Sequence, residues 1–311
     1  MAELQGMAGV AEQPGRHGQP EDGMACLPEH VRHMLHEPIN MALNDHEIRR
    51  AWQIKRAVEA NEELQNLTDF EYAHYALGTS SRQNGDEPIE QVLHRIYMMQ
   101  CFREEYNVKD SLEEGIQVLH DFTIQHRGVT LSVEFLPEGR NFISVEDLAK
   151  LYPARDMATP DQVRVYMAGM YYKNHAKMPF FFAIRDGCTA VCECDSMTWD
   201  NYEHVAFERL NEQLVKWYPK KNKDLFFVNT PSVMNFVWGI WKRMLNQNHK
   251  ETFHLGQRFE AVDDRRLDSL YCIPNEEAAR RNVLRKSFAF LQLRYKNQKE
   301  YRLPALPEEG A

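Results

Sequence analysis

Three cysteines close together, Cys188, Cys192 and Cys194, form the most concentrated set of reactive side chains in the sequence. If this segment is a strand, alternate residues share a side and the three thiols lie on one face. Three thiolates could begin a zinc site, but a C-x-C spacing on an extended strand directs the ligands apart, and no fourth ligand is evident. We therefore expect this face to line a cavity with small, apolar groups.

The other possible metal-binding and catalytic residues have less support from the sequence. His30, His33 and His36 are spaced three residues apart and could share a metal, but we expect none there. A catalytic cysteine activated by a histidine has no local signature either. Phosphate-binding loops, dinucleotide fingerprints, G-x-S-x-G and H-E-x-x-H motifs do not occur in the sequence. We therefore expect a protein that is not an enzyme and needs no cofactor.

The net charge of −9 is unevenly distributed along the chain. From Lys216 to the C-terminus there are 18 Lys or Arg and 11 Asp or Glu, so the last third is basic and the remainder acidic. No nucleic-acid-binding motif accompanies the basic part, which favours an anionic membrane surface over nucleic acid as a partner. Six cysteines without a signal peptide favour a reducing compartment, and we expect a cytoplasmic protein that associates peripherally with membranes.

Residues 217–256 contain the elements around which the rest of the chain is organised. The apolar run 225–228 predicts a buried strand, and Thr230 followed by Pro231 predicts the start of a helix. Residues 232–245 are apolar on nearly every side, so this helix must be largely covered. At about 14 residues it is shorter than the ~20 that a bilayer span needs. It is either a buried core helix or a lid that faces a lipid pocket on one side and a membrane on the other.

Caps and hydrophobic spacing predict the remaining elements. Three N-terminal helices are expected to begin at Asn44 or Asp45, at Thr68 or Asp69, and at Asp86, with a loop over residues 78–85. Downstream of them we expect a strand over residues 124–135, a helical or mixed segment over 143–152, a helix from Thr159-Pro160, and a helix over 202–217. Residues 180–184 and 189–194 are predicted strands joined by a hairpin at Asp186-Gly187.

Four short blocks together resemble the CRAL-TRIO family of lipid-binding and lipid-transfer proteins. They are Tyr218-Pro219, Val228-Asn229-Thr230-Pro231, Lys242 to Leu245, and His254-Leu255-Gly256. Residues 178–197 are similar to a hairpin of the tocopherol- and retinal-binding branch, although Ser196 stands where that branch has glycine. The resemblance implies an α/β fold with an all-helical N-terminal lobe and a mixed or parallel sheet whose pocket is closed by an apolar gate helix. The expected divisions are a disordered tail over 1–40, a helical domain over 41–110, a lipid-binding domain over 111–275, and a basic helix and tail over 276–311.

The resemblance also implies a set of site residues and a function, which is binding and membrane-to-membrane transfer of a small hydrophobic ligand. The side chains expected to line the pocket are Phe180, Phe182, Cys188, Ala190, Cys192, Phe227, Val233, Phe236, Val237, Ile240 and Trp241. Those expected to contact a membrane or a phosphoinositide are Lys216, Lys220, Lys221, Lys223, Trp238 and Lys250. Two further basic positions of the tocopherol-transfer branch fall on Asn248 and Thr252, so half of its phosphoinositide cleft is retained.

The ligand class and the role of the C-terminal helix leave alternatives open. Positions that mark the phosphatidylinositol-transfer branch are absent, so a retinoid, tocopherol, sterol or terpenoid-like molecule is favoured over a phospholipid. The basic segment 276–303 carries an apolar stripe, and it either caps the domain or docks on a membrane or a protein partner. The alternative functions are a phosphoinositide- or phospholipid-responsive signalling adaptor and, as a third option, a thiol or zinc enzyme.

Overall fold

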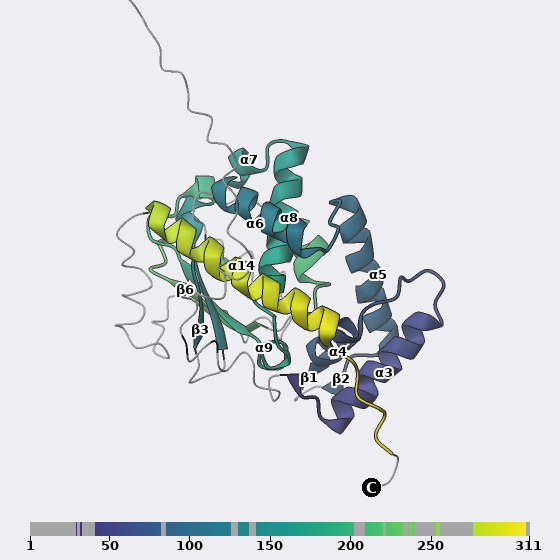
Figure 1. The fold of residues 1–311 in the computed structure, drawn as a ribbon. Coiled ribbons are helices and arrows are strands. Elements are labelled where there is room, and N and C mark those ends of the chain that lie inside the picture. Colours follow the sequence, from purple (N-terminus) through teal and green to yellow (C-terminus); the bar gives the residue numbers. More distant parts are fainter. Residues whose placement is uncertain are drawn as a thin grey trace, which may run out of the picture.

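The computed structural model of the chain describes residues 29, 32, 41–81, 85–125, 130–136, 141–201, 209–219, 222–232, 236, 238–239, 253–255 and 276–308. A group of N-terminal helices lies at one end of the molecule, beside a five-stranded sheet that is covered by further helices (Figure 1). His30, His33 and His36 lie outside the described residues. Within the described part of the chain, no helix is both long and apolar enough to cross a bilayer.

The N-terminal helices are α3 (Asp45–Glu59), α4 (Asp69–Gly78) and α5 (Ile89–Glu105). Two of the predicted starts are confirmed, because Asn44 and Thr68 each form a capping box with the glutamate three residues later. The third start is wrong. Helix α5 begins after Pro88 without a side-chain cap. Asp86 instead lies in the short strand β2 (Gly85–Asp86), which pairs with β1 (Ser80–Ser81) within the predicted loop.

The sheet has the strand order β3-β4-β5-β6-β7. Its members are β3 (Thr130–Leu136), β4 (Asn141–Asp147), β5 (Cys188–Glu193), β6 (Asn222–Val228) and β7 (Phe253–Leu255). Strands β3 and β4 are antiparallel, and each later pair is parallel. This arrangement confirms the predicted α/β class with a mixed sheet, and it confirms the strand expected at residues 225–228.

The connection from β4 to β5 contains the largest departure from the predicted elements. It comprises η3 (Leu148–Lys150), α7 (Pro153–Asp156), α8 (Pro160–Ala176) and α9 (Phe181–Asp186). The start of α8 at Thr159-Pro160 is confirmed by a capping box with Gln162. Residues 180–184 were expected to be a strand, but they form the first part of α9. A short run that is apolar on every side has no period that separates a buried helix from a buried strand, which explains the error. Gly187, at φ 81°, then ends the helix in place of a hairpin turn.

Two other boundaries also differ from the predicted ones. Helix α6 (Leu112–Gln125) includes the beginning of the strand predicted over 124–135, and that strand begins only at Thr130. The segment 143–152, expected to be helical or mixed, consists mostly of β4 followed by η3. Of the helix predicted over 202–217, the described part includes η5 (Asn211–Val215), which has π-helical geometry.

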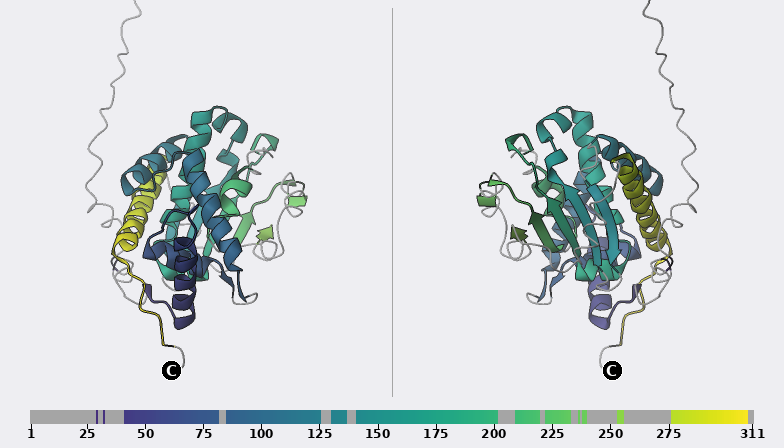
Figure 2. Two further views of the ribbon diagram at one scale, coloured as in Figure 1. Left: turned by 90° about the vertical axis from the view of Figure 1, so that its right-hand side faces the viewer. Right: turned by 90° about the vertical axis from the view of Figure 1, so that its left-hand side faces the viewer.

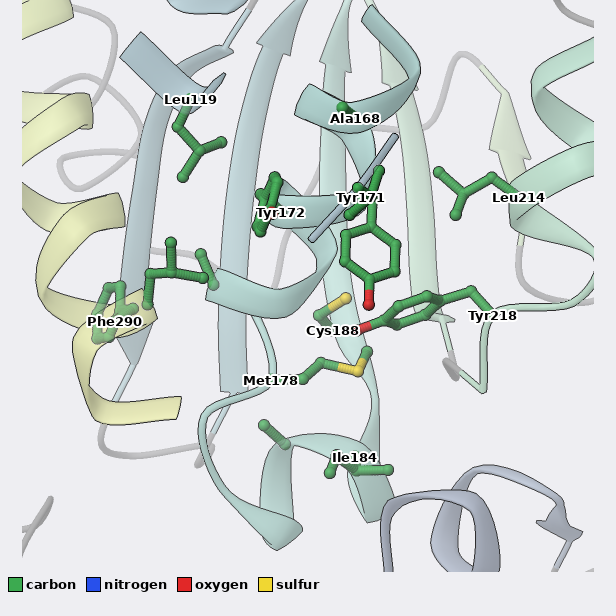
Figure 3. Close-up of a cluster of buried hydrophobic side chains, with 14 of the residues drawn as sticks. Leu119, Ala168, Tyr171, Tyr172, Met178, Ile184, Cys188, Leu214, Tyr218 and Phe290 are labelled. Carbon is green, nitrogen blue, oxygen red and sulfur yellow. The ribbon is translucent and has the colours of Figure 1, made fainter. Parts of the chain in front are cut away.

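Helices α6, α8 and α14 (Glu276–Glu300) lie together on one side of the sheet (Figures 1 and 2). Helix α14 also contacts α4, so it joins the sheet domain to the N-terminal helices. The core between these helices and β5 contains Leu119, Tyr172, Cys188, Phe290 and many other buried side chains (Figure 3). The packing is close, since a Cβ added to Gly169 would lie 2.4 Å from the Phe122 ring. Because α14 packs on α6, α8 and α4 and contributes buried side chains to this core, it is part of the folded domain, as the capping alternative predicts.

Candidate functional site

The predicted pocket residues that the structure describes fall at two ends of strand β5. Phe180, Phe182 and Cys188 are buried at its N-terminal end, where the two phenyl rings stack at 5.5 Å and 11°. In Figure 3, Cys188 lies on β5 close to Met178 and to the rings of Tyr171 and Tyr218. These residues belong to the core formed with α8 and α14.

The opposite end of β5 carries the second group of predicted pocket residues. Cys192 and Phe227 are paired across β5 and β6, and they form a separate buried cluster with Leu148, Cys194 and Met197. Ala190 lies between the two groups and is partly exposed. Neither of the two cavities described below is lined by any of these residues.

The three thiols do not share one environment. Cys194 follows the last residue of β5, and its Sγ lies 3.4 Å from the carbonyl of Cys192. Burial, and next the nearby Glu146 carboxylate, raise the pKa of the Cys192 thiol well above its usual range. A protonated, buried thiol is a poor nucleophile and a poor metal ligand. No group of three His, Cys, Asp or Glu side chains among the described residues is placed to hold a metal.

A buried polar cluster that the sequence analysis does not predict lies between α8 and the sheet. Nζ of Lys173 is 2.7 Å and Nζ of Lys177 is 3.3 Å from Oε1 of Glu146, and Lys177 also donates to the hydroxyl of Ser144 at 2.8 Å. Both lysines are about 5% exposed or less. Lys173 on α8 and Lys177 at its C-cap are four residues apart in the sequence, but the sequence analysis does not identify β4 as the strand that carries the carboxylate.

The predicted lid is described only in part. Val233, Val237, Ile240 and Trp241 lie outside the described residues, as does most of 232–245. Phe236 is 59% exposed, and its ring contacts that of Trp199, which is 55% exposed, in a T-shaped pair 5.2 Å apart. Trp238 is half-buried and lies 6.4 Å from the Phe227 ring. Trp199, on η4 (Trp199–Asn201), was not predicted as a site residue, because a single tryptophan in a loop has no periodic pattern.

The predicted basic surface is also described in part. Lys216 forms an exposed ion pair with Glu212 at 2.8 Å and lies over the ring of Trp217. Lys223 is exposed on β6, while Lys220, Lys221 and Lys250 lie outside the described residues. Of the predicted lysines, the two that the structure describes, Lys216 and Lys223, are both exposed at the surface.

A cavity of about 30 Å³ lies where α4, α5, α8 and α14 meet, and it was not predicted. Its wall contains Tyr218, whose hydroxyl is 2.9 Å from Nδ1 of His175. Nε2 of His175 lies 3.4 Å from Asp110, which also accepts a hydrogen bond of 2.6 Å from the Tyr295 hydroxyl. Burial, followed by the charge of Arg294, lowers the pKa of His175 well below its usual range. The network is therefore held with a neutral imidazole.

Comparison with known proteins finds a similarity for part of the chain. Residues 156–262, about a third of the chain, match the model of the CRAL/TRIO domain. No curated protein matches. Among solved structures, the chain is similar to one titled "Crystal structure of Sfh5", with 15% sequence identity and a TM-score of 0.37. That match covers 53% of this chain and 60% of the Sfh5 chain. Residues 156–262, from the end of α7 through α8, β5, β6 and β7, thus constitute a match to the CRAL/TRIO domain.

Proposed function

We propose that this protein binds a small hydrophobic ligand non-covalently and transfers it between membranes. The observation that carries the proposal is the match of residues 156–262 to the CRAL/TRIO domain, a domain of lipid-binding proteins. The matched segment contains α8 and the three parallel strands β5, β6 and β7. It also includes the residues of the predicted lid.

The physical requirement for such a carrier is a dry site that replaces the membrane. Each CH₂ group that leaves a bilayer loses burial worth ~0.8 kcal/mol, so the protein must offer comparable apolar cover. Phe180, Phe182, Cys188, Cys192 and Phe227 supply apolar or weakly polar surface along β5 and its neighbours. We propose that the ligand lies between these strands and the helix of residues 232–245, and that it belongs to the retinoid, tocopherol, sterol or terpenoid class.

Ligand exchange requires that the lid open where its apolar face remains covered. Phe236 and Trp199 already present their rings to solvent, and a tryptophan ring is favoured at the interface of a bilayer. Lys216 and Lys223 are also exposed and would interact favourably with anionic headgroups, each by about 1 kcal/mol. We propose that this face meets the membrane, which favours the open lid there and the closed lid in water.

The decisive experiment is native mass spectrometry of the purified full-length protein, followed by organic extraction and identification of the extracted molecule. One apolar molecule per chain would support the carrier function and name the class of cargo. Ala190→Phe, which places a large ring in the middle of β5, should reduce the occupied fraction, whereas the same change at the exposed Ala305 should not. A protein that is empty, and that also takes up no fluorescent retinoid, sterol or phospholipid analogue, would exclude the carrier and favour the signalling adaptor.

A further inference from the structure

The junction between the N-terminal helices and the sheet domain contains a buried positive charge. Arg294 on α14 is 1% exposed. Its two terminal nitrogens donate to the carbonyl of Met178 at 2.9 Å and to Nδ1 of His74 at 3.1 Å, and the guanidinium lies 4.9 Å from the Phe70 ring. Its Nε has no hydrogen-bond partner, and no carboxylate of the described residues forms an ion pair with it. A buried charge is costly unless an opposite charge accompanies it.

The neighbouring histidines do not supply that opposite charge. Burial, and next the charge of Arg294, lower the pKa of His74 well below its usual range, although the Pro219 carbonyl acts in the opposite direction. His175 is affected in the same way. Both imidazoles are therefore neutral, and Arg294 remains the buried cation of this junction.

The two nearby carboxyl groups are engaged with other partners. Oε2 of Glu71 accepts hydrogen bonds from the backbone N–H of Thr68 at 2.8 Å and from its hydroxyl at 2.9 Å. Burial, followed by the charge of Asp110, raises the pKa of Glu71, although the charge of Arg294 acts in the opposite direction. The net rise weakens Glu71 as a counter-ion. Asp110 accepts from Tyr295 and lies 3.6 Å from Arg103. Neither carboxylate contacts Arg294.

Two adjacent spaces give access to this charge. Arg294 and Arg103 both line the inner cavity of about 30 Å³, and Glu71 lines it as well. Arg103 and Gln100 also line an outer cleft of about 230 Å³, together with Gln65, Asn107 and the acidic Glu104. The outer wall is thus mostly amide and guanidinium, and Arg103, 28% exposed, stands where the two spaces meet.

We propose that these spaces bind a small polar molecule through its carboxylate group. The carboxylate pairs with Arg294 and Arg103 in the inner cavity, and the polar remainder lies against the amides of the outer cleft. A carboxylate accepts the charged hydrogen bonds that a guanidinium donates. The two parallel oxygens of a carboxylate match the planar fork of a guanidinium, which favours bidentate pairing with Arg294 or Arg103. This site is separate from the proposed lipid pocket and goes beyond the carrier function.

The test uses the full-length protein with acetate, glycerate, octanoate and inorganic phosphate as separate probes at one ionic strength. Saturable broadening of the ¹³C-carboxyl resonance should occur with acetate and more strongly with glycerate, at one molecule per chain. At a ligand concentration of ten times the dissociation constant, the bound carboxylate should raise the unfolding temperature by about 3 °C. Arg294→Gln should abolish both effects. Arg95→Gln, on the same helix as Arg103 but outside both spaces, should preserve them.

A second variant keeps the proposal testable if Arg294→Gln fails to fold. Arg103→Gln changes a partly exposed side chain at the entrance and should weaken acetate and glycerate binding by about 10-fold. Unchanged affinity in folded Arg103→Gln would overturn the proposal. Phosphate bound in preference to acetate would overturn the assignment of a carboxylate ligand. Octanoate bound more tightly than glycerate would overturn the inference that the rest of the ligand is polar. Lipid exchange should be unaffected by Arg103→Gln, so this result is independent of the carrier function.

Discussion

Replacing the exposed aromatic pair Trp199 and Phe236 with alanine tests whether this face meets a membrane. The two side chains are 55% and 59% exposed, so about half of each apolar surface is available to a bilayer. Burying a whole side chain of this kind is worth ~1.5–3 kcal/mol, and half of it about 0.8–1.5 kcal/mol. Each single substitution should therefore lower the membrane partition coefficient roughly 4–12-fold. The double variant should lose less than the product, because the rings contact one another at 5.2 Å and their effects are coupled.

The assay is co-sedimentation with vesicles of phosphatidylcholine and phosphatidylserine, combined with transfer of the identified ligand between vesicle populations. Ile124→Ala is the matched control, because Ile124 is 51% exposed near the end of α6 and was not assigned to the membrane-facing surface. Thermal unfolding should be nearly unchanged in all variants, since exposed side chains contribute little to the core. Partition of Trp199→Ala and Phe236→Ala equal to that of Ile124→Ala would refute a membrane contact at this pair.

Three further predictions concern the scaffold around the site. Glu146→Gln removes the carboxylate between two buried ammonium groups and should reduce the free energy of unfolding in urea by about 3 kcal/mol. Glu212→Gln, in an exposed ion pair, should reduce it by less than about 1 kcal/mol. Equal losses in the two variants would contradict the burial argument. His175 is neutral in the folded protein but takes up a proton in the unfolded chain below pH ~6.5, so the free energy of unfolding should fall below that pH, by at most ~1.4 kcal/mol per pH unit. His175→Phe should make the plot of this free energy, measured in urea, against pH less steep. An unchanged slope would contradict a neutral His175 in the folded state. Gly169→Ala should destabilise the protein by about 1–2 kcal/mol despite the better helix propensity of alanine, because the new Cβ meets the Phe122 ring. Gly239→Ala, with open space around the new Cβ, should be neutral or stabilising. Thermal unfolding of both variants measures the difference.

Local signals in the sequence predicted the elements whose ends are determined by nearby residues. The capping boxes at Asn44, Thr68 and Thr159 each join residues three positions apart, so the spacing of two residue types was sufficient. The same reasoning failed for residues 180–184, where the aromatic residues are buried on every side of α9 and the hairpin-like Asp186-Gly187 ends a helix. In this case the tertiary environment, which covers all faces of the segment, decided between two local structures of similar propensity.

The polar contacts between the N-terminal helices and the sheet domain could not be predicted from sequence patterns, because their partners are distant in the chain. Arg294 and His74 are separated by 220 residues, and Arg185 and Glu47, which form a two-bonded ion pair at 2.7 Å, by 138. In sequence, Arg294 belongs to a run of basic residues on a terminal helix, and such a run is ordinarily a solvated face. Only the packing of α14 against α4 and α8 buries this one guanidinium while Lys296 and Lys299 stay exposed. Net charge along a helix therefore did not indicate where the functional charge lies; burial did, since a cation excluded from water must be matched by an anion from the chain or from a ligand.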